Sequence, residues 1–137
     1  MILEFRKALL NAVTPTRAHP TDAGFDLTAA TKEFSSLYNE YDTGIAVAIP
    51  DGYVGLVFPR SSVSGTGMSL ANAVGVVDAS YRGTIKLRFR RGEGREYEAG
   101  ERVGQLVVLK LECTSMEEVN GIDETVRATK GFGSSGR

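Results

Sequence analysis

Short apolar runs alternate with turn-forming residues along the whole chain. Gly, Pro, Asn and Asp stand between the runs, and none of the runs has the spacing of an amphipathic helix. Ile45, Val47 and Ile49 instead alternate with small residues, as on one face of a strand. The pattern predicts an all-β fold, and we expect strands at residues 2–6, 24–28, 45–49, 53–58, 71–77, 85–90 and 105–111, with a further short strand at 119–122.

Two of the apolar segments carry additional information. Residues 105–111 are apolar on both faces, which is typical of a strand covered on two sides in a sandwich or at a subunit interface. After Arg60, either Ser61 or Ser62 can cap one short helix that ends at the following glycines.

Two further segments are expected to lie outside the sheets. Residues 31–43 are predicted to form a surface loop between strands, with a small apolar cluster of its own that includes Phe34, Tyr38 and Tyr41. Residues 125–137 hold one aromatic ring among glycines and serines and are expected to be a flexible tail. The 137 residues therefore predict a single β domain at 1–124 followed by a C-terminal lid at 125–137.

Charge and residue usage exclude several kinds of function. With sixteen basic and seventeen acidic residues the net charge is −1, so the chain lacks the basic field that grips a nucleic-acid polymer. The single Cys113 and the single His19 allow no internal disulfide and no usual zinc site. His19 precedes Pro20 in a loop and is better explained as a surface residue than as the base of a Ser-His-Asp triad. The first residues resemble neither a signal peptide nor a membrane span, and we expect a soluble protein of the cytoplasm, or of the host cytoplasm if the source is viral. The metal chemistry that remains is Mg²⁺ carried on a phosphate ligand, with no side-chain metal site.

The most informative segment is Gly-Val-Val-Asp-Ala-Ser-Tyr-Arg-Gly at residues 75–83. An apolar run leads directly into Asp78, and an alternating strand follows Tyr81 and Gly83. We predict a β-hairpin with an acid at its throat. Alone, such an Asp is also explained as an ordinary solvated turn residue.

Four other clusters carry potential chemistry, and each has a structural explanation when it is taken alone. Asp26 stands in Ala-Gly-Phe-Asp-Leu near a strand end, and Gln105 ends Gly-Glu-Arg-Val-Gly-Gln where a buried strand begins. Pro-Arg-Ser-Ser at 59–62 can direct a guanidinium, two hydroxyls and helix N–H groups at phosphate oxygens. Arg127 and the Gly-Phe-Gly-Ser-Ser run at 131–135 combine a phosphate fork with a ring able to stack on a base.

Together, in this order, the five clusters resemble the five motifs of the trimeric deoxyuridine triphosphatases (dUTPases) over residues 23–136. The resemblance implies a distorted jelly-roll-like β-barrel or sandwich subunit and a homotrimer with active sites at subunit interfaces. It implies Mg²⁺-dependent hydrolysis of dUTP to dUMP and pyrophosphate, which limits uracil in DNA and supplies dUMP for dTMP synthesis.

The resemblance also assigns roles to residues. Asp78 would be the general base for a water that attacks the α-phosphorus, and the residues agree, because it is the best-placed proton acceptor once His19 is set aside. The ring of Tyr81 would lie under the deoxyribose and exclude ribonucleotides sterically. Asp26 would act through Mg²⁺-bound waters or brace the site, and Mg²⁺ would be held chiefly by the phosphates. The substrate-binding residues so implied are Asn72, Gly75, Val76, Val77 and Lys86 for uracil, Arg60, Ser61, Ser62 and Gln105 for the α- and β-phosphates, Arg127, Ser134 and Ser135 for the γ-phosphate, and Phe132 with Gly133 in the closing tail.

Some residues depart from the family pattern, and two alternatives remain open. Ala128 and Lys130 replace common glycines of the fifth motif, and Ser62 replaces a frequent glycine of the second. One alternative is a dCTP deaminase of the same fold, against which the spacing of Asp78 and Tyr81 argues. The other is a non-catalytic nucleotide-sensing or protein-binding relative, with residues 31–43 as the surface that would meet a partner.

Overall fold

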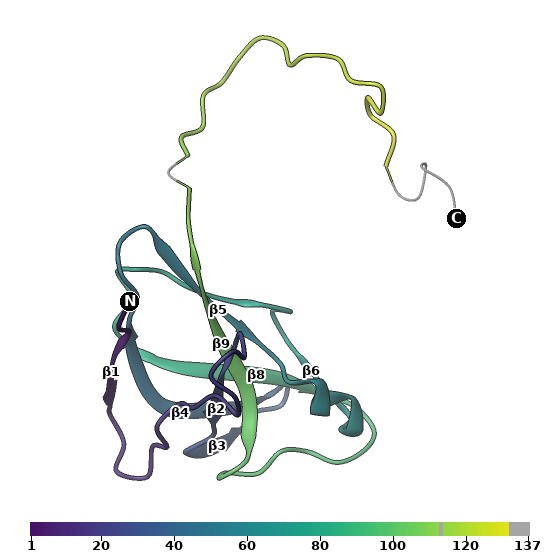
Figure 1. Ribbon diagram of the computed structural model, residues 1–137. Coiled ribbons are helices and arrows are strands. Elements are labelled where there is room, and N and C mark those ends of the chain that lie inside the picture. Colours follow the sequence, from purple (N-terminus) through teal and green to yellow (C-terminus); the bar gives the residue numbers. More distant parts are fainter. Residues whose placement is uncertain (113, 132–137) are drawn as a thin grey trace.

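Two antiparallel β-sheets face each other across the core of the chain (Figure 1). The structure is a computed structural model that describes residues 1–112 and 114–131. One sheet has the strand order β1-β4-β8-β6, with β3 also paired to β4, and the other has the order β2-β9-β5-β7. The all-β, jelly-roll-like sandwich predicted from the sequence is confirmed.

The strands are β1 (Glu4–Lys7), β2 (Phe25–Thr28), β3 (Thr31–Phe34), β4 (Asn39–Ala48), β5 (Tyr53–Phe58), β6 (Met68–Leu70), β7 (Gly75–Val77), β8 (Thr84–Arg91) and β9 (Arg102–Lys110). The predicted short helix is confirmed as a 3₁₀ helix, η1 (Ser61–Gly65). Its N-cap residue is Arg60, and no side chain caps it, so Ser61 and Ser62 lie inside the helix instead of before it. Their hydroxyls are therefore not consumed by capping.

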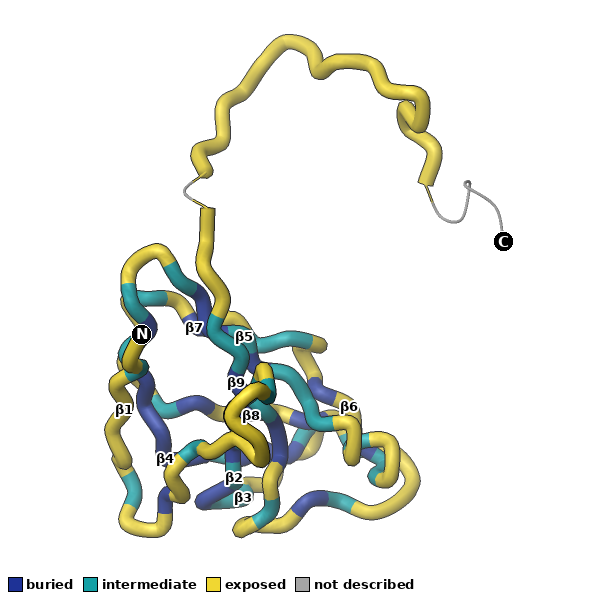
Figure 2. Tube along the Cα trace, in the orientation of Figure 1, coloured by how far each residue is buried: buried dark blue, intermediate teal, exposed yellow. Residues whose placement is uncertain are grey.

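Alternation along the strands builds the core. Ile85, Leu87 and Phe89 point inward from β8, while Lys86, Arg88 and Arg90 point outward. Phe89 packs edge-to-face against Tyr41 and Tyr97, with ring centroids 5.8 and 5.6 Å away. Figure 2 shows the buried residues gathered between the sheets and the exposed ones on loops and on the C-terminal tail.

The prediction of a surface loop at residues 31–43 was wrong. β3 and the first half of β4 form a hairpin there, and Tyr41 is fully buried instead of joining Phe34 in an exposed aromatic patch. The charged residues that favoured a loop are cross-strand partners: Glu40 lies opposite Arg88 and Asp42 opposite Lys86 on β8. Phe34 does remain exposed.

The predicted strand at 71–77 and the hairpin at 75–83 also need correction. Ala73 has a left-handed backbone (φ 59°), which ends the extended run and separates β6 from β7. β7 pairs with β5 in one sheet, whereas β8 pairs with β4 and β6 in the other. Residues 78–83 therefore cross from one sheet to the other instead of closing a hairpin.

The C-terminal segment carries no strand in the described residues. The short strand expected at 119–122 does not form, and this stretch is exposed. After β9 the chain runs away from the sheets (Figure 1). Within residues 1–112 and 114–131, no helix has the length and apolar character needed to cross a membrane.

Candidate active site

A cavity of about 210 Å³ lies where β7 and β8 leave their sheets, and we call it the base pocket. It contains the segment that the sequence analysis singled out. Its lining comprises Val57, Asn72, Gly75, Val76, Val77, Asp78, Tyr81, Thr84, Ile85 and Lys86. All of the residues expected to shape a uracil slot and the proposed base and sugar residues are therefore brought together by the fold.

A β-turn positions the side chains of Asp78 and Tyr81 in the base pocket. The N–H of Tyr81 donates to the carbonyl of Asp78 at 3.0 Å, which closes a β-turn directly after β7. The Tyr81 hydroxyl donates to the Thr84 carbonyl at 3.0 Å, so the ring is fixed at both ends of the turn. Asp78 is exposed, and its carboxylate is open to water. The turn therefore holds the Tyr81 ring in place and leaves the Asp78 carboxylate accessible as a proton acceptor.

The path of the chain from Ala73 to Gly75 shapes one wall of the base pocket. The left-handed Ala73 directs the chain back toward β5, where Gly75 lies opposite Val57. A Cβ on Gly75 would come within 3.2 Å of the Val57 Cβ, so glycine permits the close approach of the two strands. The pocket wall there is consequently made of backbone.

A second cavity, of about 260 Å³, lies at the start of β2 and the end of β5, and we call it the phosphate pocket. Its lining comprises Ala18, Asp22, Ala23, Gly24, Asp26, Arg60, Ser61 and Gln105. The Gln105 amide N–H donates to the Pro59 carbonyl at 3.2 Å, which ties β9 to the segment that begins η1. A Cβ on Gly24 would collide with the Gln105 side chain, so glycine makes room for that amide.

Asp26 is the organising group of the phosphate pocket. One of its carboxylate oxygens lies 2.9 Å from Nε of Arg60, and the other accepts from the guanidinium of Arg102 at 3.0 Å. The Asp26 side chain is largely buried, and register places it opposite Gln105. Of the two roles expected for Asp26, bracing the site fits this geometry directly.

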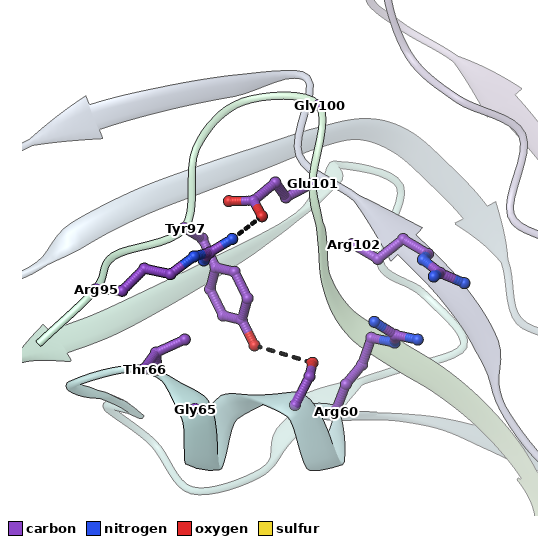
Figure 3. Close-up of a pocket in the computed structure, with 9 residues that line it drawn as sticks. Arg60, Gly65, Thr66, Arg95, Tyr97, Gly100, Glu101 and Arg102 are labelled. Atoms are coloured by element: carbon purple, nitrogen blue, oxygen red, sulfur yellow. Dashed lines mark hydrogen bonds and ion pairs between the residues drawn. The ribbon is translucent and has the colours of Figure 1, made fainter.

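A third cavity, of about 440 Å³, lies beside η1 (Figure 3). We call it the arginine pocket, and it takes in Ser62 while Ser61 faces the phosphate pocket. The two serines expected to bind the same phosphates are thus divided between two cavities that share Arg60 as a wall. Its lining comprises Arg60, Ser62, Gly65, Thr66, Arg95, Tyr97, Gly100, Glu101 and Arg102.

In one chain the base pocket and the phosphate pocket are far apart. β7 runs antiparallel to β5, with Val77 opposite Gly55, so Asp78 leaves the sheet near the start of β5. Arg60 follows the other end of β5. From Val54, beside which Asp78 leaves the sheet, to Arg60 is six residue positions, which correspond to roughly 20 Å in an extended chain. A triphosphate bound at Arg60 of one chain therefore does not place its α-phosphorus beside Asp78 of that chain.

Glu40 of β4 forms ion pairs with two basic side chains beside the base pocket. Glu40 is buried and pairs with Nε of Arg88 at 2.6 Å and with Nζ of Lys86 at 3.2 Å. The hydrogen bond from Arg88 holds the pKa of Glu40 below its usual value, and the hydrogen bond to Glu40 raises the pKa of Lys86. The ammonium of Lys86 is therefore engaged by the carboxylates of Glu40 and Asp42.

The comparisons with known proteins agree on one family. The family model for dUTPase matches residues 11–136. The chain belongs to the dUTPase family. Among curated relatives, the deoxyuridine 5'-triphosphate nucleotidohydrolase of Nocardia farcinica is 46% identical over 129 residues, covering 89% of this chain and 78% of that protein. The Corynebacterium jeikeium enzyme of the same name is 46% identical over 131 residues, covering 89% and 84%.

Solved dUTPase structures share the fold. A point mutant of the Staphylococcus bacteriophage 80alpha dUTPase with dUpNHpp superposes with a TM-score of 0.86 at 28% identity and covers 99% of both chains. A mutant dUTPase from phage phi11 of S. aureus, described as coordinating a structural Mg(II) ion, has a TM-score of 0.75 at 25% identity and covers 88% of this chain and 98% of that one. In the described part of this dUTPase-family chain, no group of three or more His, Cys, Asp or Glu side chains is placed to hold a metal.

Of the fifth motif, the described residues include Arg127 but not the residues expected to close over the ligand. Arg127 lies on the exposed tail, where its Nε donates to the Lys130 carbonyl at 2.9 Å. Phe132, Gly133, Ser134 and Ser135 lie outside the described residues.

Three residues of the dUTPase-family chain gain roles that the sequence analysis did not give them. Thr84 anchors the Tyr81 ring through its carbonyl, Arg102 pairs with Asp26, and Tyr97 borders the arginine pocket. Arg102 carried a local signal, because it stands inside the fourth motif next to a buried strand. Thr84 and Tyr97 carried none, since their contacts depend on the path between the sheets.

Proposed function

We propose that this protein hydrolyses dUTP to dUMP and pyrophosphate, by in-line attack of an Asp78-activated water on the α-phosphorus. The observation that carries the proposal is the base pocket, in which Asn72, the backbone of 75–77, Asp78, Tyr81 and Lys86 converge. In the cell this activity would limit uracil in DNA and supply dUMP for dTMP synthesis, and we place it in the cytoplasm.

The base pocket is suited to uracil and deoxyribose. Backbone N–H and C=O groups along β7 can pair with the acceptor–donor–acceptor edge of uracil and leave the amino group of cytosine without a partner. The Tyr81 ring, fixed through Thr84, occupies the space that a ribose 2'-hydroxyl would need. Asp78, exposed at the pocket mouth, takes the proton of the attacking water.

The phosphate pocket supplies positive charge for the triphosphate. Arg60, Ser61 and Gln105 of this pocket, with Ser62 from the adjoining arginine pocket, hold the α- and β-phosphates, and Asp26 keeps Arg60 in place. Arg127, Ser134 and Ser135 reach the γ-phosphate as the lid at 125–137 closes over the domain at 1–124, with Phe132 and Gly133 over the base. Mg²⁺ enters on the triphosphate, whose oxygens are the ligands that this cation prefers.

A homotrimer with sites between subunits reconciles the two distant pockets. Leu56 lies opposite Val76 and Val107, so these side chains share the outer face of the β5–β7–β9 sheet. Val76 is 64% exposed. Gln105, opposite Asp26, lies on the same face at the phosphate end. Covering this face with another copy buries apolar surface and brings a base pocket toward a neighbouring phosphate pocket.

A pyrophosphate-release assay on dUTP, dCTP, dTTP and UTP, with and without Mg²⁺, tests the proposal. We expect release from dUTP alone and only with Mg²⁺. Asp78→Asn should keep dUMP and dUTP binding and lose hydrolysis by orders of magnitude. Near-normal turnover in Asp78→Asn would remove the proposed base, and ammonia release from dCTP would assign the protein to deamination.

Complementation tests the shared site separately. Asp78→Asn and Arg60→Gln copies should each be inactive as homotrimers. Co-refolding them in equal amounts should restore activity in up to roughly a quarter of the sites, because some sites then combine an intact Asp78 with an intact Arg60 from a neighbouring copy. If the site lay within one chain, mixing would restore nothing.

A further inference from the structure

The arginine pocket shares Arg60 and Ser62 with the proposed triphosphate site, and the rest of its lining is not explained by that site. Arg60 separates it from the phosphate pocket, whereas Arg95 and Tyr97 belong to the loop before β9 and to none of the substrate-binding residues above. Its volume of about 440 Å³ exceeds that of the phosphate pocket.

The charge of the arginine pocket favours an anion. Arg60 and Arg102 share the single carboxylate of Asp26, and Arg95 pairs with Glu101. Three guanidinium groups against two carboxylates leave an excess of one positive charge among these groups. Because Arg95 and Arg102 are each about half exposed, their remaining N–H groups are open to a ligand.

Hydroxyl groups add neutral donors at the floor of the pocket. The Tyr97 ring is buried, with its hydroxyl 3.5 Å from Oγ of Ser62, a distance that leaves both groups free to turn toward a closer acceptor. Figure 3 shows the Tyr97 hydroxyl pointing toward η1, with Arg95 and Glu101 on one side and Arg60 and Arg102 on the other. Cations on two sides of a polar floor suit an anion with two charged ends.

We propose that the arginine pocket binds inorganic pyrophosphate as it leaves the neighbouring phosphate pocket. The inference rests on the proposed function, which makes pyrophosphate a product at the shared wall formed by Arg60. Pyrophosphate passes that wall, keeps Arg60 as a partner and exchanges Ser61 and Gln105 for Arg95 and Tyr97. The pocket acts as a product-exit subsite.

Calorimetric titration of the full-length protein with sodium pyrophosphate tests this assignment. Arg95→Gln should weaken pyrophosphate binding about tenfold, the effect of losing one charge-assisted contact at a half-exposed side chain. Arg95→Lys should recover part of the affinity, and Tyr97→Phe, which keeps the buried ring, should weaken binding about threefold. Arg90→Gln is the matched control, because Arg90 is an exposed arginine of β8 outside the pocket and its loss should change nothing.

Three outcomes would overturn the assignment: unchanged pyrophosphate affinity in Arg95→Gln and Tyr97→Phe, an equal loss in Arg90→Gln, or inorganic phosphate binding as tightly as pyrophosphate. The titration needs no turnover, so its result is separate from that of the hydrolysis assay. Arg95-dependent pyrophosphate binding without dUTP hydrolysis would refute the proposed function and with it the exit role, while leaving a pyrophosphate site in the arginine pocket. Hydrolysis with Arg95-independent binding would sink the exit subsite alone.

Discussion

Asp26→Asn is the substitution that most directly tests how the phosphate pocket is organised. The carboxylate of Asp26 holds Arg60 at 2.9 Å with one oxygen and Arg102 at 3.0 Å with the other. Asparagine has the same shape but only one acceptor atom, and its NH₂ group would face a guanidinium. The substitution therefore frees at least one arginine without opening a cavity.

The size of the effect follows from the exposure of the two arginines. A hydrogen bond to a charged group contributes about 1.5–3 kcal/mol when it is shielded, and an exposed ion pair contributes at most about 1 kcal/mol. Arg60 is the more buried partner, with 26% of its side chain exposed against 55% for Arg102. Releasing Arg60 should thus cost about 2 kcal/mol of transition-state stabilisation, or roughly thirtyfold in kcat/KM.

The assay is steady-state pyrophosphate release from dUTP over a range of Mg²⁺ concentrations. Arg102→Gln is the control, because it removes the exposed partner and leaves Asp26 with Arg60; it should cost no more than about fivefold. The reasoning fails if Arg102→Gln is as damaging as Asp26→Asn, or if Asp26→Asn loses less than about threefold. The Mg²⁺ concentration at half-maximal rate should stay constant, and a large rise in Asp26→Asn would assign the carboxylate to metal-bound water instead.

Two further predictions concern stability, measured by chemical denaturation at fixed protein concentration. The hydrogen bond from Arg88 is the main cause that lowers the pKa of Glu40, so the ionised carboxylate stabilises the fold above the unfolded pKa of 4.5, and this stabilisation is lost as the pH falls through the folded pKa. Glu40→Gln should therefore flatten the plot of stability against pH below about pH 4.5, and an unchanged plot would contradict this. Tyr41→Phe should cost about 1–2 kcal/mol, because the fully buried hydroxyl donates to the Tyr97 carbonyl at 2.9 Å and that acceptor would be left unpaired; a neutral result would mean that water or a neighbour replaces the donor.

Periodicity predicted the strands whose two faces differ in polarity. β5 falls at the predicted residues 53–58, and β8 at 84–91 extends the prediction by one residue at each end. The failures arise where local preference and tertiary context disagree. The first half of β4 reads as a loop because its acids alternate with polar residues, yet each acid meets a basic partner on β8. Ala73 gives no local sign of its left-handed backbone, so the break between β6 and β7 was not predictable.

The candidate site likewise has parts that were predictable from the sequence and parts that were not. The base pocket was predictable because its residues, 72–86, lie close together in the sequence and meet across one crossing between the sheets. The pairing of Asp26 with Arg102 was not, because the two residues are 76 positions apart and meet only through the pairing of β2 with β9. The arginine pocket was not predictable, because it combines parts of the second and fourth motifs with Arg95 and Tyr97, which belong to no motif.

The short length of β7 links assembly to substrate selection. This strand has three residues and lies at the edge of its sheet, where β5 is its one partner within residues 1–112 and 114–131. Val77 anchors it in the core, while Val76 is exposed on the outer face beside Leu56, one position from the anchor and two from Asp78. A copy packed on that face, as proposed, would restrain Val76, and with it the backbone proposed to pair with the base and the turn that carries Asp78. In the proposed trimer the contact between subunits therefore does more than bring two pockets together, because it also holds the wall of the base pocket in the conformation that recognises uracil.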